Sequence, residues 1–538
     1  MFNFKKKIMK KLGLLFLFCV GLAFHSCEDA YKITQDGEFN EDATFKTMAD
    51  LKLYLNGVYA FASNFSEIGI TAAITDEAAL GSQNAGQDRD VYGFILNSED
   101  GFADDIWITQ YALINRANRF LRGAARITPT ASELTEYNAM IAQAKCLRAY
   151  GHFQLLTFFS TNMADNSALG VILMDHVPAI FEKNPRNTNG EVFEFIESDL
   201  NDAYANIVDY TNATAPNTKA WTYFSKNAID AFRARMYMYR GNYPLALQYA
   251  NQVIAAGPAL VAVTPVPPGA VGSTAWNTAF YNATNPTNPY RRMWADYAQG
   301  EVILSFDKSV GKETIASLFY FNRTNLTGGP FHELDRNLFN LLEQNNGVNG
   351  STDIRRYAFV DPTSKIDSGY PGTTAPDYTT DPAYKANDVL LIDKYPGKTG
   401  YELGNDLKIF RTSEMYFIRA EALIATGDLP GAAAAIKMVR DARTFRGPLP
   451  VLPVYANATQ AWADVLYERR LELAFEGHRY VDLKRLGVIA GVGLDRYSRD
   501  CAIVPICSIP TTDYRFTLPI PLNEINGNTN VTQNPGYN

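Results

Sequence analysis

Two stretches of this sequence, about 190 residues apart, each carry the pattern of two helices joined by a tight turn. In residues 228–256 the first helix is expected to end near Gly241 and the second to begin at about Pro244. Alanines recur at helical spacing among tyrosines in both halves of this stretch. Residues 416–440 repeat the arrangement, with the turn at Gly427. Each stretch therefore predicts a helical hairpin that packs into a core.

These hairpins resemble tetratricopeptide units, in which alanines let paired helices approach and aromatic rings fill the gaps between them. Two further pairs fit the same scheme less regularly: 48–61 with 104–121, and 139–159 with 191–207. Plain helical hairpins without a common origin remain an alternative. In both cases the predicted fold class is mainly α, with a tetratricopeptide-like scaffold of helical hairpins.

The composition of the sequence changes between the two clear hairpins, at residues 257–400. Proline and glycine interrupt this segment too often for long helices, and residues 368–384 are rich in Gly, Pro, Thr and Asp. Short apolar runs such as EVILSF suggest strands. Long irregular segments on a rigid scaffold are common places for binding sites. We therefore expect a loop-rich, ligand-binding portion here.

The N-terminus has the form of an export signal. Five lysines precede an uncharged run at 12–24, and Ser26-Cys27 follows. The run is shorter than the roughly 20 residues that a membrane span needs. Ser26-Cys27 resembles a bacterial lipobox, which predicts a signal peptide at 1–26 and a lipid on Cys27. An ordinary signal-peptidase site or an uncleaved anchor remains open.

Charge excludes one class of partner. Without residues 1–26, which hold five lysines and no acidic residue, 44 Lys and Arg face 57 Asp and Glu, so the net charge is about −13. Nucleic-acid binding depends on neutralising phosphates with a basic surface, so we set it aside.

Cys501 and Cys507 could form a disulfide in an oxidising compartment, whereas Cys146 lies in a helical apolar pattern and is expected in the core.

A row of carboxylates could be mistaken for a catalytic centre. Glu468, Glu472 and Glu476 recur at four-residue spacing on one predicted helix, with Arg469 and Arg479 nearby as possible partners. Glycoside cleavage needs two carboxyls about 5 to 9.5 Å apart across a bound sugar. A row along one helix more often forms salt bridges, so we interpret it as structural.

Other chemical motifs are sparse. The histidines beyond the signal are His152, His176, His332 and His478, and their spacing matches no zinc motif. The sequence contains no GxSxG, no GxxxxGK[ST] and no EF-hand loop. We predict a protein that is not an enzyme and has no cofactor, while calcium held by loop carbonyls stays possible.

Blocks in the C-terminal third carry a family resemblance: 410–422 (FRTSEMYFIRAEA), 467–487 (YERRLELAFEGHRYVDLKRLG) and 518–537. Matching blocks upstream stand in the same order, at 55–61, 145–155 and 392–397, together with Trp107, Tyr111, Ile114 and Asn118. The set resembles the SusD/RagB family of Bacteroidetes nutrient-uptake lipoproteins. This resemblance implies a tether at 27–45 and one SusD-like domain at 46–538, with the irregular insert at about 257–400.

The resemblance also implies a function. SusD-like proteins bind oligosaccharides, or peptides in the RagB branch, and pass them to a SusC-like TonB-dependent outer-membrane transporter. Glu28 and Asp29 directly after Cys27 resemble the signal that places Bacteroidetes lipoproteins on the outer face of the outer membrane. We therefore expect a lipid-anchored cell-surface receptor for oligosaccharide. Alternatives are a RagB-like peptide receptor, a helical-repeat assembly scaffold, a hydrolase and a surface-layer protein.

Family members place the ligand surface on the loop before the Trp107 helix and on the irregular middle of the chain. No family motif in these regions identifies a ligand-binding residue of this sequence, so the candidates are chosen by residue type. Aromatic rings can stack on sugar rings while charged and amide groups bond the hydroxyls. The candidate ligand-binding residues are Asp88, Arg89, Tyr92, Trp276, Tyr281, Tyr290, Arg292 and Trp294.

Overall fold

The computed structural model describes residues 44–209, 219–282, 285–308, 313–320, 329–343, 346–347, 350–367, 387–398 and 400–537. The predicted signal peptide, Cys27, the acidic pair after it and the stretch 368–384 lie outside these ranges. No helix in the described ranges is long and apolar enough to cross a membrane.

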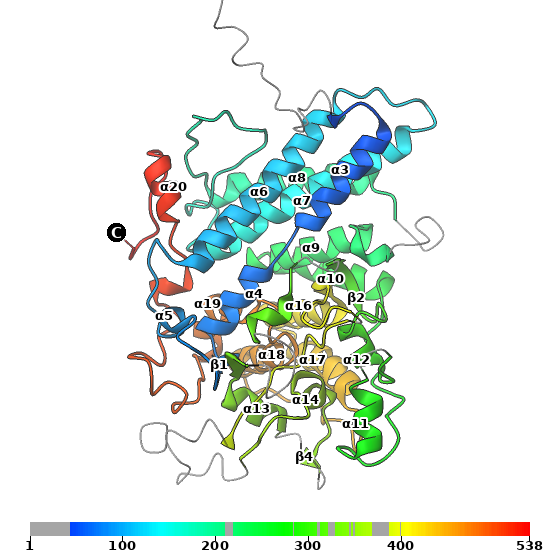
Figure 1. Cartoon of the computed structure of the whole chain (residues 1–538), viewed down its shortest axis with the longest axis vertical. Coiled ribbons are helices and arrows are strands. Elements are labelled where there is room, and N and C mark those ends of the chain that lie inside the picture. Colours follow the sequence, from blue (N-terminus) through cyan, green and yellow to red (C-terminus); the bar gives the residue numbers. More distant parts are fainter. Residues whose placement is uncertain are drawn as a thin grey trace, which may run out of the picture.

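One group of long helices forms one end of the molecule (Figure 1). It consists of α3 (Met48–Phe61), α6 (Gly101–Ala124), α7 (Leu134–Phe159) and α8 (Asn189–Asn206). The Thr47 and Thr188 side chains start α3 and α8 with capping boxes. Helix α3 packs on α6, and α7 packs on both α6 and α8. The two less regular helix pairs predicted from the sequence are thus in contact.

The two clear hairpins are confirmed. The first is α9 (Lys226–Tyr239) with α10 (Tyr243–Ala256), and the second is α16 (Thr412–Ala425) with α17 (Leu429–Arg443). The left-handed backbone that each tight turn requires falls on Gly241 (φ 71°) and Gly427 (φ 88°). Helix α10 packs on α16, so the hairpins are neighbours in space despite the long insert between them. Helices α18 (Ala458–Glu472) and α19 (Arg479–Ala490) pack together as the next pair.

The irregular middle consists of short elements. Its helices are α11 (Thr274–Phe280), α12 (Pro289–Trp294), η2 (Ile315–Leu318), α13 (Arg336–Glu343) and α14 (Ile354–Phe359). Its strands are β2 (Val302–Phe306), β3 (His332–Leu334), β4 (Asn346–Gly347) and β5 (Gly350–Ser351). Strand β2 pairs antiparallel with β6 (Leu407–Arg411), which leads directly into α16. This pairing attaches the middle of the chain to the helical scaffold.

Six shorter elements complete the described fold. They are α4 (Phe65–Ile74), β1 (Ala78–Leu80), α5 (Arg89–Tyr92), η1 (Ala220–Thr222), η4 (Tyr514–Phe516) and α20 (Leu522–Gly527).

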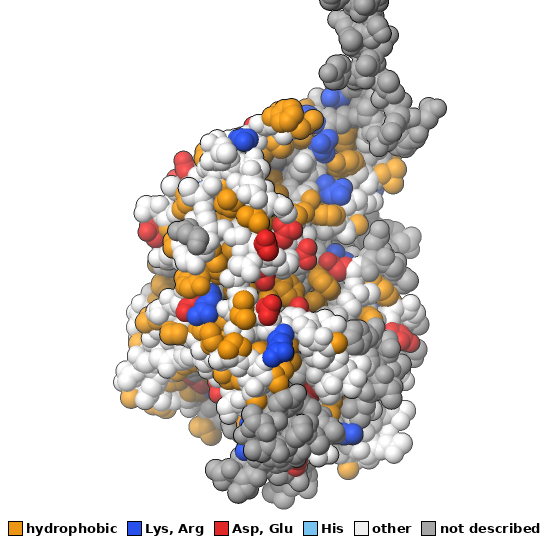
Figure 2. All heavy atoms as spheres, turned by 60° about the vertical axis from the view of Figure 1, so that its left-hand side comes forward, with side chains coloured by type: hydrophobic (Ala, Val, Ile, Leu, Met, Phe, Trp, Pro, Cys, Tyr) orange, Lys and Arg blue, Asp and Glu red, His pale blue; other side chains and the backbone are white. Residues whose placement is uncertain are grey.

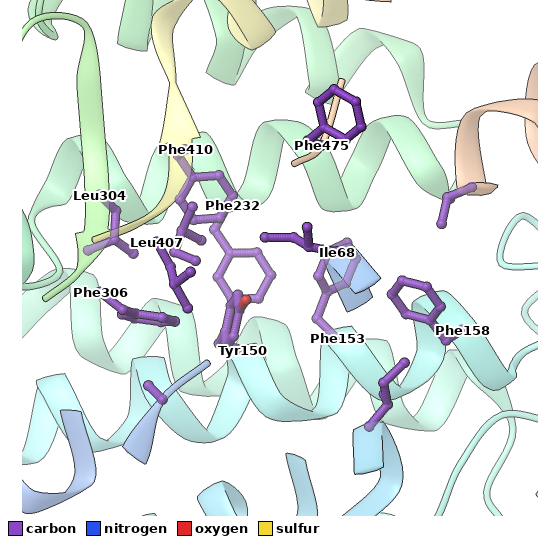
Figure 3. Close-up of a cluster of buried hydrophobic side chains, with 14 of the residues drawn as sticks. Ile68, Tyr150, Phe153, Phe158, Phe232, Leu304, Phe306, Leu407, Phe410 and Phe475 are labelled. Carbon is purple, nitrogen blue, oxygen red and sulfur yellow. The ribbon is translucent and has the colours of Figure 1, made fainter. Parts of the chain in front are cut away.

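Buried aromatic rings hold these layers together (Figure 3). Tyr150 on α7 lies edge-on to Phe306 of β2, with 5.2 Å between ring centroids. Phe232 of α9 lies 5.2 Å from Phe153 and 6.0 Å from Phe410 of β6. Such pairs add to the free energy gained by burying the rings. Cys146 on α7 is a free, buried thiol, which confirms its predicted place in the core.

Candidate functional site

Three segments that are far apart in the sequence meet at one surface, which we call the loop surface: residues 81–93, 329–335 and 495–508. Strand β1 pairs antiparallel with β3, and this brings Leu80 opposite His332. Just beyond the strand, the Gly81 N–H donates to the Phe331 carbonyl at 2.8 Å. A Cβ on Gly81 would come 2.5 Å from the Pro330 carbonyl oxygen, so the close approach requires glycine.

Asp88 occupies a strained position on this surface. It adopts a left-handed backbone conformation (φ 56°) directly before α5. Its carboxylate Oδ2 lies 3.5 Å from Nε2 of the buried His332. Burial raises the pKa of Asp88 and lowers the pKa of His332, while the attraction between the two groups opposes both shifts. Strain of this kind in a residue other than glycine is frequent at binding sites.

The next segment is fixed by a disulfide loop. Cys501 and Cys507 form a disulfide, which settles the pairing that the sequence left open. The exposed Arg89 donates from Nη2 to the Ile503 carbonyl inside this loop, at 2.5 Å. Tyr92 is buried, with its hydroxyl 4.0 Å from the Cys501 sulfur. Arg496 stacks over the Tyr92 ring at 4.0 Å and donates to the Tyr92 carbonyl, which fixes the end of segment 81–93.

The loop surface therefore offers hydrogen-bonding groups on a fixed backbone. In its first segment, residues 81–93, the exposed or half-exposed polar side chains are Ser82, Gln83, Asn84, Gln87, Asp88, Arg89 and Asp90. The half-exposed ring of Phe331 lies beside them. Donors, acceptors and one aromatic ring can bind a hydroxyl-rich ligand without reacting with it.

The other predicted ligand-binding residues lie elsewhere, and three of them, Trp276, Tyr290 and Trp294, are fully buried. Trp276 stacks on Phe280 at 4.6 Å, and the Lys394 ammonium lies 4.5 Å from the Trp294 ring. Trp276 packs among other rings of the irregular middle, edge-on to Tyr357 of α14, and Trp294 lies edge-on to Phe359 and Tyr395. Neither ring can stack on a ligand in this conformation.

Tyr290 is likewise fully buried, and its hydroxyl donates to Glu472 at 3.4 Å. Tyr281 is half-buried and donates to the Tyr357 carbonyl at 2.9 Å. Arg292 is half-buried and binds Asn285 on its own segment. Figure 1 places α11 and α12 on the opposite side of the molecule from α5. The predicted residues thus form two separate groups, of which only the Asp88 group reaches the loop surface.

Two residues of the loop surface escaped the sequence analysis. His332 was considered only as a metal ligand, and Arg496 had no recognisable pattern. Each contacts the loop through a pairing between distant segments, so no local motif marks it.

The prediction of one helix for all three glutamates is wrong, because α18 ends at Glu472 and Glu476 lies in the turn before α19. The glutamates form ion pairs, as predicted, but their partners differ from those expected. Glu472 pairs with Arg411 at 2.8 Å and with Arg443 at 2.9 Å, and Glu468 pairs with Arg355 at 2.7 Å. Burial opposes ionisation of Glu472, but Arg443 and Arg411 outweigh it and hold the pKa of Glu472 well below its usual value.

The two expected partners are used elsewhere. Arg469 pairs with Asp482 at 2.7 Å, and Arg479 pairs with Asp76 at 2.7 Å. Because these charges are almost fully buried, the ion pairs join α17, α18, β6 and the loop after α4 into one unit.

Two of the histidines also have structural positions. His152 is buried, and its Nε2 accepts from the Met174 N–H at 3.0 Å, while burial lowers its pKa to about 4. His478 is buried at the start of α19, and burial lowers its pKa well below the usual value for histidine. Within the described residues, no three His, Cys, Asp or Glu side chains converge in a way that could hold a metal ion.

The architecture defines a scaffold of helical hairpins that carries a polar loop surface held by long-range contacts. Comparison with known proteins assigns this scaffold to a family. A family model described as "Starch-binding associating with outer membrane" matches residues 34–238, and the "SusD family" model matches residues 360–537. The chain belongs to the SusD family.

The similarity to known relatives extends along almost the whole chain. "SusD-like protein P2" of Formosa agariphila is 27% identical over 98% of this chain and 100% of its own length. The solved structure of a SusD superfamily protein from Bacteroides thetaiotaomicron superposes with a TM-score of 0.69 at 22% identity, covering 91% of this chain and all of that one. A structure titled "Laminarin binding SusD-like protein" gives 0.63 at 20% identity, covering 92% of this chain and all of that one. These structures establish the shared fold.

Proposed function

We propose that this protein captures oligosaccharides at the outer membrane through the loop surface and passes them to a SusC-like TonB-dependent transporter. Membership of the SusD family carries this proposal. The similarity to a SusD-like protein whose title describes laminarin binding supports carbohydrate as the ligand class. The protein breaks no bond of its ligand, because its role is capture and release.

The loop surface suits such a role. A ligand that must be handed on needs moderate affinity, and groups that bond hydroxyls in competition with water supply it. Asp88 and Asp90 offer acceptors, and Arg89 offers donors from a guanidinium that the Ile503 carbonyl orients. The disulfide and Arg496 hold the backbone before a ligand arrives, which lowers the entropy cost of binding.

The proposed location rests on the N-terminal segment. A lipid on Cys27 would leave 16 residues between the anchor and Thr44, where the described fold begins. Cys27→Ala should move the protein from the outer-membrane fraction into the soluble fraction. Continued partitioning of the variant with outer membrane would contradict lipid anchoring.

An array of glycans and peptides tests the ligand class. The probe is the mature chain with Cys27→Ser, which carries no lipid. The proposal expects binding to one class of glycan, reduced in Arg89→Ala and unchanged in Arg122→Ala, an exposed arginine at the far end of α6. Binding to peptides alone would contradict it in favour of a RagB-like peptide receptor.

A further inference from the structure

A pocket lies away from the loop surface, on the side of the long helices. Its volume is about 190 Å³, and it is bounded by α6, residues 172–184 and α20. Figure 2 turns this side of the molecule toward the viewer. The volume is below the roughly 300 to 1,000 Å³ that is typical of sites for drug-sized ligands. A pocket of this size suits one small ring.

The first wall of the pocket is rigid. The Tyr111 hydroxyl on α6 donates to the Ile172 carbonyl at 2.9 Å and accepts from the Ile172 N–H at 2.8 Å. Asn118, two turns further along α6, donates to the carbonyls of Met174 and His176 at 3.0 and 2.8 Å. These bonds fix residues 172–176 against the helix.

The second wall is formed by α20 and is equally fixed. Glu524 accepts from the Trp107 indole at 3.2 Å, and Asn528 donates to the Asn184 carbonyl at 2.8 Å. The pocket is therefore present before any ligand binds. A preformed site loses less entropy on binding than one that must be assembled.

The polar groups that face the pocket have bonding capacity left. Asn115 accepts from Arg119 through Oδ1 at 3.0 Å, and its Nδ2 has no partner among the described residues. Asn184 donates from Nδ2 to Glu182 at 2.7 Å, and its Oδ1 has no partner within the same ranges. One amide thus offers a donor and the other an acceptor, which is the combination that vicinal hydroxyls bind.

Charge decides which small rings fit. Hydrogen bonds from Asn184 and the Ala179 N–H lower the pKa of Glu182 to about 2, so this carboxylate stays ionised. Glu524 is the second carboxyl of the pocket lining, and no lysine or arginine belongs to the lining. The imidazole of His176 is already shared between Asp175 and Glu182, at 2.6 and 2.8 Å. An anionic ring would be repelled, so the pocket favours a neutral one.

An apolar edge stands beside the pocket. Ile180 and Phe181 are 94% and 90% exposed, on the loop between the lining residues Pro178 and Glu182. Tyr111, Ile114 and Ile172 add apolar surface to the lining. The C–H face of a sugar ring lies well against apolar and aromatic surface, while its hydroxyls point to the polar groups around it.

We propose that this pocket binds one neutral sugar ring of a glycan, with Asn115 and Asn184 bonding the hydroxyls and Phe181 contacting the adjoining ring. In this role the pocket is a second glycan contact, which steadies a long chain while the loop surface holds another part of it. The choice of carbohydrate rests on the proposed function, whereas the position of the pocket and its preference for neutral rings do not.

Titration calorimetry with neutral malto-, laminari- and manno-oligosaccharides of six units, and with an oligouronate of equal length, tests the proposal. The probe is again the mature chain with Cys27→Ser. The variants are Asn115→Ala and Phe181→Ala, and the matched controls are Asn56→Ala and Leu53→Ala on the exposed side of α3. We expect each pocket variant to weaken binding of a neutral oligosaccharide about threefold to tenfold, with both controls unchanged.

The outcomes separate the two proposals. A neutral glycan that binds all four variants equally well would overturn the pocket and leave the loop surface standing. Binding of the oligouronate alone would overturn the pocket as well. If no glycan binds the wild-type chain, both proposals fail together. If Phe181→Ala alters only co-purification with a partner protein, the apolar edge is a protein contact and the pocket proposal is wrong.

Discussion

The carboxylate Oδ2 of Asp88 lies 3.5 Å from Nε2 of His332, so the loop before α5 is tied to the buried strand β3. The Asp88 side chain therefore has two roles on the loop surface. It orients the segment that carries Arg89, and it presents an acceptor at the surface itself, since it is only half-buried.

Removing the Asp88 charge should weaken ligand binding without unfolding the protein. Asn tolerates the left-handed conformation of residue 88, so Asp88→Asn retains the backbone. We expect glycan affinity to fall about threefold to tenfold, because one charged hydrogen bond is lost. Calorimetry checks this against Glu194→Gln, an exposed carboxylate on α8. Equal affinities of the two variants would show that Asp88 does not contact the ligand.

Trp276 should affect stability and leave the ligand unaffected. Its indole N–H has no hydrogen-bond partner among the described residues, so Trp276→Phe removes only volume. Trp276→Ala is expected to lower the free energy of unfolding by about 3 to 5 kcal/mol, and Trp276→Phe by clearly less. Chemical denaturation measures both. A loss of glycan affinity in folded Trp276→Phe would restore the ring as a binding residue.

The buried ion pairs predict a strong dependence on Arg443. Arg443→Met leaves Glu301 and Glu472 buried without one of their partners, at positions where Arg443 lies 2.7 and 2.9 Å away. We expect a loss of about 3 to 5 kcal/mol in the free energy of unfolding. Lys437→Ala on the same helix removes a more exposed pair with Asp441 and should cost less than about 1 kcal/mol. Similar losses in both variants would refute a special role for the network.

Glu67 should make the protein less stable as pH rises. Burial raises its pKa to about 8, so its contribution to stability is complete below about pH 4.5 and is lost as pH rises toward 8. Glu67→Gln keeps an acceptor for the Gln110 amide, which donates to Glu67 at 2.6 Å. The variant should therefore be more stable at pH 7.5, by about 4 kcal/mol, and similar to wild type at pH 4.5. Parallel stability curves for the two proteins between these pH values would rule this out.

Local sequence patterns were sufficient to predict the helical hairpins of the scaffold. The turn at Gly241 and the proline that follows it mark the α9–α10 hairpin, because both features act within a few residues. The same logic located α16 and α17. Such signals do not depend on where the rest of the chain lies.

Local sequence patterns could not predict the burial of the aromatic candidates. Helices α11 and α12 have seven and six residues, too few for a periodic pattern to reveal which side faces the core. Trp276 and Trp294 could therefore be identified by type but not by exposure. The ion-pair partners of Glu472 could not be predicted from local patterns either. Arg411 and Arg443 lie on different elements that only the tertiary fold brings together.

Hydrogen exchange of the mature chain, with and without a saturating glycan identified on the array, tests the central claim most directly. Binding at the loop surface predicts slower exchange in residues 81–93 and 495–508, with α11 and α12 unchanged. Protection of α11 and α12 with no change in residues 81–93 would contradict the account and return the ligand to the irregular middle.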